Sequence, residues 1–214
     1  VGVGVKRLET HRVWGKGHTG YKPYFEKIMP RVNHIEGSLV EAGFGKGVTA
    51  NVIVKLMNNG KLTKRDIWLF DSFEGFPHPH EFDKTPNRST RRGEWKVPMG
   101  PALRLKESID TNVEVVKGFF QDTIPAHYEG GQIAILHLDC DLYNSYKNCL
   151  EGLYDKVAPG GLILFDEYRA PIQLKRFPGA AKAIDEFFEN RNVDVEWGMV
   201  EWPGTQKYYM FKPK

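Results

Sequence analysis

The regular alternation of short apolar runs with helical stretches limits the folds open to this chain more than any other feature. Five runs have the length and the β-branched or aromatic content typical of buried strands, at residues 38–41, 67–71, 113–117, 132–139 and 162–166. Helical patterns separate them, at about 48–58, 101–110, 144–157 and 179–190. This alternation predicts an α/β fold of three layers, with helices on both faces of a mostly parallel sheet.

The last part of the sequence departs from the alternation. Residues 193–201 and 207–211 have strand patterns, and a short turn of Trp202, Pro203, Gly204 and Thr205 joins them. A connection this short predicts a hairpin, so we expect the final strand to run antiparallel to its neighbour.

The length of 214 residues predicts a single domain. We expect residues 1–20 to form an N-terminal extension and residues 77–106 a lid-like insertion. A membrane span needs about 18 to 20 apolar residues, and the sequence has no such run, so we expect a soluble, cytoplasmic protein without a membrane partner. Cys140 and Cys149 fall at a strand end and inside the next helix, a poor geometry for pairing, and we expect free thiols. The sequence is also compatible with a homo-oligomer.

Basic residues are concentrated in one segment. Residues 84–106 hold seven lysines and arginines against Glu94, which gives the segment a charge of +6 and, from the total of +3, leaves −3 for the rest. The segment is interpreted as a lid or a clamp for an anionic substrate. A nucleic-acid footprint is the alternative.

A glycine-rich turn follows the first predicted strand. Glu41 stands at the strand end, and Gly43, Gly45 and Gly47 follow at two-residue spacing. This spacing differs from the G-x-G-x-x-G pattern of dinucleotide sites, and a carboxylate repels pyrophosphate. The turn suits a ligand without phosphate, such as S-adenosylmethionine with its sulfonium and ammonium groups. A purely structural turn is the alternative.

The next two strands end in residues that suit an adenosine. Asp71 is the candidate for both ribose hydroxyls, because two vicinal donors match two carboxylate oxygens, and Ser72 follows it. Both could instead cap a turn. Gly118, Phe119 and Phe120 follow the third strand, where an adenine would lie against apolar side chains; we expect one of the two phenylalanines to belong to the core.

Carboxylates gather after the fourth and fifth predicted strands, as Asp139, Asp141, Asp166 and Glu167. Two bare carboxylates about 5 Å apart repel by about 3 kcal/mol at an effective dielectric of about 20, so they need a shared proton or a cation. A hard divalent cation such as Mg²⁺ is the simpler solution. We expect Asp139, Asp166 and Glu167 as its ligands, and Asp141 as a helix cap or a solvated side chain.

Five sequence blocks resemble the macrocin O-methyltransferase (TylF-like) family of sugar O-methyltransferases. The blocks are residues 39–47, 68–77, 116–125, 138–143 and 159–168, and the likeness covers about 37–188. The resemblance implies a class I (Rossmann-like) methyltransferase fold, S-adenosylmethionine as donor, and Mg²⁺ held by Asp139, Asp166 and Glu167. Where the family has two successive aspartates, this chain has Asp166 and Glu167.

The implied reaction is methyl transfer to a hydroxyl of a sugar or a sugar-bearing natural product, with Mg²⁺ as Lewis acid and Asp139 as acceptor of the leaving proton. His137 is expected to be a core histidine, and His11, His18, His78 and His80 are weaker candidates for the base. Two alternatives remain. One is a noncatalytic domain that binds an adenosyl ligand, and the other is a nucleic-acid methyltransferase, suggested by the basic segment.

Overall fold

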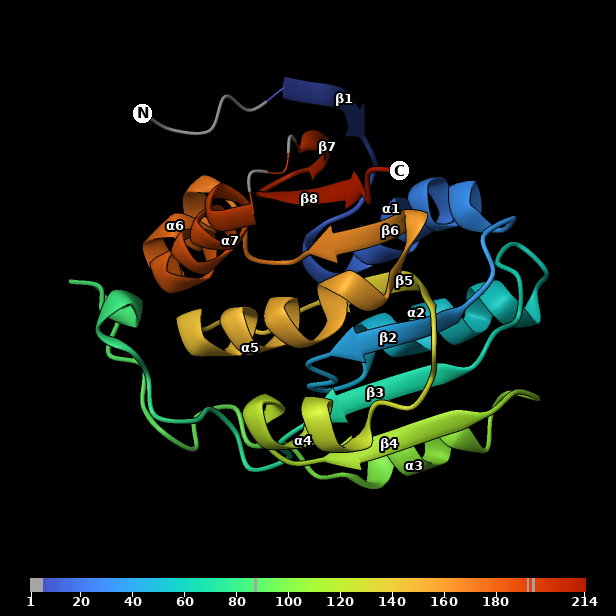
Figure 1. Ribbon diagram of the computed structural model, residues 1–214, viewed down its shortest axis with the longest axis horizontal. Helices are drawn as coiled ribbons and strands as arrows, with labels where there is room; N and C mark the ends of the chain where they lie inside the picture. The colour runs from blue at the N-terminus through green and yellow to red at the C-terminus, as the bar shows by residue number, and fades with distance from the viewer. Residues whose placement is uncertain (1–5, 87, 192, 194) are drawn as a thin grey trace.

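An eight-stranded mixed sheet forms the centre of the protein (Figure 1). The computed structural model describes residues 6–86, 88–191, 193 and 195–214. The strands are β1 (Lys6–Arg12), β2 (Ser38–Ala42), β3 (Ile67–Asp71), β4 (Val113–Lys117), β5 (Ile133–Leu138), β6 (Val157–Phe165), β7 (Glu196–Trp202) and β8 (Thr205–Phe211). Their order across the sheet is β1-β7-β8-β6-β5-β2-β3-β4. Strand β8 is antiparallel to both β6 and β7, and the other neighbouring pairs are parallel, which confirms the predicted sheet and its C-terminal hairpin.

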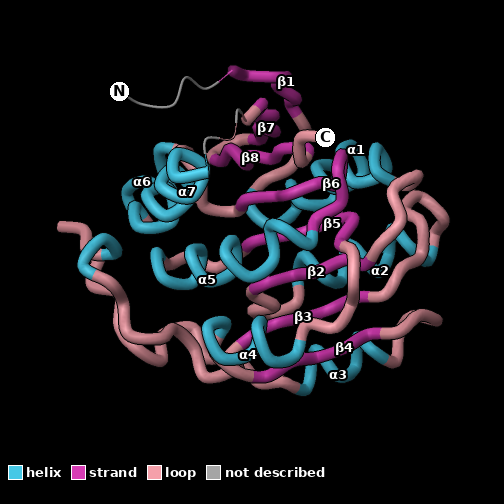
Figure 2. The backbone as a smooth tube through the Cα atoms, in the orientation of Figure 1, coloured by secondary structure: helices cyan, strands magenta, loops and turns pink. Residues whose placement is uncertain are grey.

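Helices cover both faces of the sheet, as the backbone tube shows (Figure 2). One apolar core includes residues of α1 (Tyr21–Ile28), α2 (Val48–Asn58) and α3 (Gly100–Lys106). The core on the opposite face includes residues of α4 (Phe120–His127), α5 (Tyr143–Leu153) and α7 (Pro178–Arg191). Helix α6 (Pro171–Arg176) precedes α7, and short 3₁₀ turns lie at Gly17–Gly20, Met29–Val32, Glu81–Asp83 and Tyr154–Lys156. Strand β5 is buried along its whole length and contributes side chains to both cores.

The predicted elements agree with the structure best where the pattern is strongly apolar. Strands β3 and β4 and helix α2 have the predicted bounds. Strand β6 begins five residues earlier than predicted, because the Pro-Gly-Gly sequence at 159–161 belongs to the strand. Strand β1 and helices α1, α4 and α6 were not among the predicted elements. Helix α4 is eight residues long with Pro125 inside it, so its helical pattern is weak.

The first 20 residues and the 77–106 segment both contain regular secondary structure. The first contains β1 and the turn at Gly17–Gly20, and the second contains the turn at Glu81–Asp83 and α3. Strand β1 pairs in parallel with β7 at the edge of the sheet, so it adds a strand to the sheet. Residues 1–5 of the expected extension, residue 87 of the expected insertion and residue 194 of the expected strand lie outside the described residues. Among the residues that are described, none of the helices is both long and apolar enough to cross a membrane.

The parallel strands β2, β3, β4 and β5 end at the same edge of the sheet, together with β6 (Figure 1). The segment between β3 and α3 passes along this edge. In open α/β sheets this is where ligands bind.

Candidate active site

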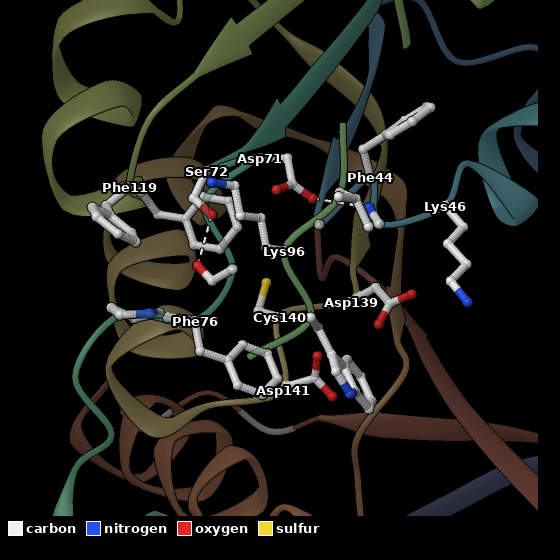
Figure 3. Close-up of a pocket in the computed structure, with 18 of the residues that line it drawn as sticks. Phe44, Lys46, Asp71, Ser72, Phe76, Lys96, Phe119, Asp139, Cys140 and Asp141 are labelled. Atoms are coloured by element: carbon white, nitrogen blue, oxygen red, sulfur yellow. Dashed lines mark hydrogen bonds between the residues drawn. The ribbon is translucent and has the colours of Figure 1, made fainter. Parts of the chain in front are cut away.

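A cavity of about 460 Å³ lies at this edge, and the turns after β2, β3, β4 and β5 all contribute to its wall. Figure 3 shows Asp71 and Phe44 along one side of it and Asp139, Cys140 and Asp141 along another. Most residues expected to bind a cofactor line the cavity together: Gly43, Gly45, Asp71, Ser72, Gly118, Phe119, Phe120 and Asp139. The described wall does not include Glu41 or Gly47.

The glycine turn is closely packed on one side and open on the other. Gly43 has a φ of 97°, and a Cβ there would stand 1.8 Å from the carbonyl oxygen of Asp139, so only glycine fits. At Gly45 a Cβ would meet no atom within 4 Å, because this residue faces the open cavity. Gly47 precedes α2 with a φ of 73° and packs against the ring of Phe44.

Glu41 lies under this turn. Its side chain is fully buried, and Oε1 is 3.0 Å from Nδ1 of His137, which is itself buried as expected of a core histidine. The arrangement places Glu41 behind the cavity wall, in contact with the next strand of the sheet.

Asp71 joins the turns that follow β2 and β3. Its Oδ2 accepts a hydrogen bond from the Gly45 amide at 2.9 Å, and its Oδ1 accepts one from the Phe73 amide at 2.7 Å. Burial raises the pKa of Asp71, and the backbone amides of Phe73, Gly45 and Phe44 oppose this effect. Ser72 donates to the carbonyl oxygen of Gly75 at 2.7 Å, so its hydroxyl stabilises the same turn.

Three acids of the expected metal site come together. Asp139, Asp166 and Glu167 each offer a carboxylate oxygen, and these oxygens lie within 4.8 Å of one another. Burial, followed by the charge of Asp166, raises the pKa of Asp139 and of Glu167 well above their usual range. Oxygen donors grouped in this way fit a hard divalent cation such as Mg²⁺.

Two residues that the sequence analysis did not identify hold Asp166. The Tyr21 hydroxyl donates to Oδ1 of Asp166 at 2.5 Å, and the Lys207 ammonium forms an ion pair with Oδ2. Burial disfavours the charge of Asp166 and is the largest single effect, but Lys207, a side-chain hydrogen bond with Glu167 and the electrostatic effect of His137 together outweigh it and lower the pKa of Asp166 to about 2. Lys207 could have been noticed because strand alternation places it on the same face as the buried Tyr209.

Asp141 does not cap helix α5 and is not solvated, contrary to expectation. It is buried with a φ of 58°, lines the cavity, and donates its backbone amide to Oε2 of Glu167 at 3.1 Å. Asp83, from the 77–106 segment, instead accepts from the Tyr143 amide at the start of α5, at 2.8 Å. Burial, followed by the charge of Asp166, raises the pKa of Asp141 to about 7.

The two cysteines lie closer together than their sequence positions suggest. Their Sγ atoms are 3.6 Å apart, both thiols are free, and both are buried. The expected free thiols are confirmed, and the Cys140 thiol donates to the Cys149 sulfur without forming a disulfide.

The 77–106 segment packs over the cavity through an aromatic cluster. Trp95 contacts Phe76 and Phe177, with ring centroids 5.3 and 5.7 Å apart, and the Arg88 guanidinium lies 5.4 Å from the Trp95 ring. Arg88 also pairs with Glu94. Trp95, Lys96 and Val97 line the cavity, and Trp95 remains 49% exposed.

Comparison with known proteins places this architecture among the O-methyltransferases. Residues 23–209 match the family described as Macrocin-O-methyltransferase (TylF). A tetracenomycin-glycoside 4'-O-methyltransferase of Streptomyces olivaceus is 31% identical over 141 residues, 63% of this chain and 54% of that protein. Demethyldecarbamoylnovobiocin O-methyltransferase of Streptomyces niveus is 28% identical over 192 residues, 86% of this chain and 66% of that protein.

The solved structure of the O-methyltransferase NovP superposes with a TM-score of 0.74 at 24% identity, covering 93% of this chain and 84% of that one. The fold is therefore that of a class I methyltransferase. The chain spans about half to two thirds of the length of these curated relatives. The family match covers most of the chain, and this protein belongs to the macrocin O-methyltransferase (TylF) family.

Proposed function

We propose that this protein transfers a methyl group from S-adenosylmethionine to a hydroxyl of a sugar or a sugar-bearing natural product, with Mg²⁺ as a second cofactor. The observation that carries the proposal is that one cavity is lined by the glycine turn, by Asp71 and by Asp139. Asp139 in turn offers a carboxylate oxygen within 4.8 Å of oxygens of Asp166 and Glu167 at the end of β6. One curated relative is named as a 4'-O-methyltransferase of a rhamnosyl-tetracenomycin and the other as a demethyldecarbamoylnovobiocin O-methyltransferase, which supports a natural-product acceptor and, for the first, a sugar-bearing one.

S-adenosylmethionine fits the half of the cavity formed by the first three turns. Asp71 keeps acceptor capacity for the ribose hydroxyls, since a carboxylate has about four lone-pair sites and the backbone amides of Phe44, Gly45 and Phe73 do not fill them all. Phe119 and Phe120 offer apolar surface for the adenine, and the open side of Gly45 lets the ligand approach the backbone. Gly43, Gly118 and Ser72 shape the turns around it. Glu41 is buried and does not line the cavity, so it would contribute indirectly, by supporting the glycine turn that follows it.

Asp139, Asp166 and Glu167 would hold the Mg²⁺. When bound, the ion would bind neighbouring acceptor oxygens and lower the pKa of the attacking hydroxyl. Asp139 lines the cavity and is proposed to receive the proton that leaves this hydroxyl. The other residues that line the cavity would contribute mainly by holding the methyl donor and the attacking hydroxyl in line.

The acceptor is proposed to lie under the 77–106 segment, which would act as its lid within a single methyltransferase domain. Trp95 presents half of its surface, and Lys96 brings positive charge to the same wall. Arg88 is engaged with Glu94, Trp95 and Phe177, so it supports the segment and is less suited to hold the acceptor.

The test is a methyl-transfer screen by mass spectrometry. The purified chain is incubated with S-adenosylmethionine and a panel of hydroxylated glycosides, with Mg²⁺ or with chelator. A mass gain of one methyl group on a sugar hydroxyl, lost in chelator, is the expected result. Tight binding of S-adenosylhomocysteine without methylation of any acceptor would indicate a noncatalytic domain instead.

A further inference from the structure

A lysine is buried inside the acidic site. Lys207 belongs to β8, whose register with β6 pairs Tyr208 with Phe165, so Lys207 lies beside the strand end that carries Asp166. The side chain is only 4% exposed. Its ammonium forms an ion pair with Oδ2 of Asp166 and donates to the carbonyl oxygen of the same residue at 3.1 Å.

A second contact holds the other oxygen of the same carboxylate. The Tyr21 hydroxyl of α1 donates to Oδ1 of Asp166, and the Lys207 ammonium is 5.4 Å from the centre of the Tyr21 ring. Both oxygens of Asp166 are therefore held by side chains of this chain. Neither Asp139 nor Glu167 pairs with a lysine or arginine in the described residues.

The lysine changes the charge of the site. Asp141, Asp166 and Glu167 are buried and Asp139 beside them is partly buried, and Lys207 supplies a positive charge at one of these four acids. A divalent cation bound by Asp166 would lie close to this ammonium, and two cations at such separation repel strongly in a buried site. The ammonium also uses electron pairs of Asp166 that a metal would otherwise share.

We propose that Lys207 is a built-in counter-ion of the acidic site. It holds Asp166 in place without a metal, and it weakens the binding of a divalent cation at Asp139, Asp166 and Glu167. This inference rests on the proposed metal site. Tyr21 completes the arrangement by orienting the carboxylate, without adding charge.

The test measures Mn²⁺ binding by electron paramagnetic resonance in the wild type and in variants. Lys207→Met removes the charge and should bind Mn²⁺ at least about tenfold more tightly. Lys207→Arg keeps the charge and should stay close to the wild type. Lys212→Met is the matched control, because the Lys212 ammonium donates only to the carbonyl oxygens of Tyr154, Asp155 and Val157 in the described structure.

Thermal unfolding gives a second readout that does not depend on activity. Without metal, Lys207→Met should unfold at a lower temperature than the wild type, because Asp166 is left unpaired, and Mn²⁺ should raise its unfolding temperature more than it raises that of the wild type. Lys207→Gln carries the same expectations if the Met variant does not fold.

Two results would overturn the inference, and they differ from each other. Equal Mn²⁺ affinity in the wild type and in the uncharged variants would show that Lys207 does not restrain the metal, and the proposed metal site would stand. No Mn²⁺ binding in any variant would remove the metal from the proposed function as well, and the inference with it.

Discussion

The backbone amide of Gly45 donates a hydrogen bond to Oδ2 of Asp71 at 2.9 Å, which ties the glycine turn after β2 to the tip of β3. The carboxylate proposed to bind the ribose therefore also shapes the loop proposed to receive the rest of the cofactor. Because Asp71 bonds the glycine turn, the two turns form one wall of the cavity, although 26 residues separate Gly45 from Asp71.

Asp71→Ala should therefore fold but lose affinity for S-adenosylhomocysteine by about 1.5 to 3 kcal/mol, the usual range for a charge-assisted hydrogen bond. Part of the loss would come from the loosened glycine turn. Isothermal titration calorimetry measures it. Asp110→Ala, at an exposed aspartate of the next connection, is the matched control and should bind normally. Unchanged affinity in a folded Asp71→Ala protein would exclude this carboxylate from the site.

The predictable part of the site comes from local sequence. Asp71 and Asp139 directly follow strongly apolar strands, and the carboxyl ends of parallel strands share one edge, so their proximity follows from the pattern alone. The sheet was predictable for the same reason, because alternating strands and helices leave few other packings.

The contacts that complete the site are long-range. Tyr21 and Lys207 reach Asp166 from 145 and 41 residues away, through α1 and the hairpin strand β8. No local pattern indicates such pairs. Asp141 was misassigned because its position before α5 is typical of a cap, while the cap contact comes from Asp83, 60 residues away from Tyr143.

Asp83 should make stability depend on pH in a defined direction. Its Oδ1 accepts from the Tyr143 amide and its Oδ2 from the His80 amide, yet burial raises the pKa of Asp83. The folded protein therefore takes up this proton at a higher pH than the unfolded chain does. Protonation of Asp83 therefore increases the free energy of unfolding, and so stabilises the fold, as pH falls from 7 through the raised pKa toward about 4.

Asp83→Asn lacks this titration. The difference in unfolding free energy, wild type minus Asp83→Asn, should therefore increase as pH falls from 7 to about 4, measured by urea denaturation at several pH values. At pH 7 the variant also loses one acceptor for the His80 amide, worth about 1 kcal/mol. Asp110→Asn serves as the control. A difference that stays constant or decreases with falling pH would contradict the assigned direction.

The 77–106 segment should be held over the cavity by Arg88. Its guanidinium pairs with Glu94 and lies 5.4 Å from the Trp95 ring and 5.1 Å from the Phe177 ring. Arg88→Ala should raise the rate of tryptic cleavage at the exposed Arg91 and Arg92 at least about threefold, because the segment loses its main side-chain anchor. Gel analysis over time gives the rate.

Ligands give the second arm of this experiment. S-adenosylhomocysteine together with an acceptor should slow cleavage in the wild type, as expected of a lid that closes over its substrate. Arg104→Ala, which removes an exposed arginine at the far end of the same segment, is the control and should be cleaved at Arg91 and Arg92 at the wild-type rate. Equal cleavage rates with and without ligands would argue against a lid.

Asp139 gives the cleanest test of the proposed metal. Asp166→Asn would also leave the buried Lys207 without its partner, and a loss of activity could then come from unfolding. Asp139→Asn keeps the shape of the side chain and removes one anionic oxygen from the group of three. We expect metal affinity and turnover to fall together, each at least about tenfold, while S-adenosylhomocysteine still binds.

Two further measurements separate the metal from general electrostatic effects. Asp155→Asn changes an exposed aspartate paired with Arg191 and should leave metal binding and turnover unchanged. Glu167→Asp should be milder than Asp139→Asn, because it keeps the charge and shortens the arm by one methylene. Chelation should abolish turnover, and added Mg²⁺ should restore it. Full activity in chelator would remove the metal from the mechanism, and an unimpaired Asp139→Asn variant would remove Asp139 as the proton acceptor.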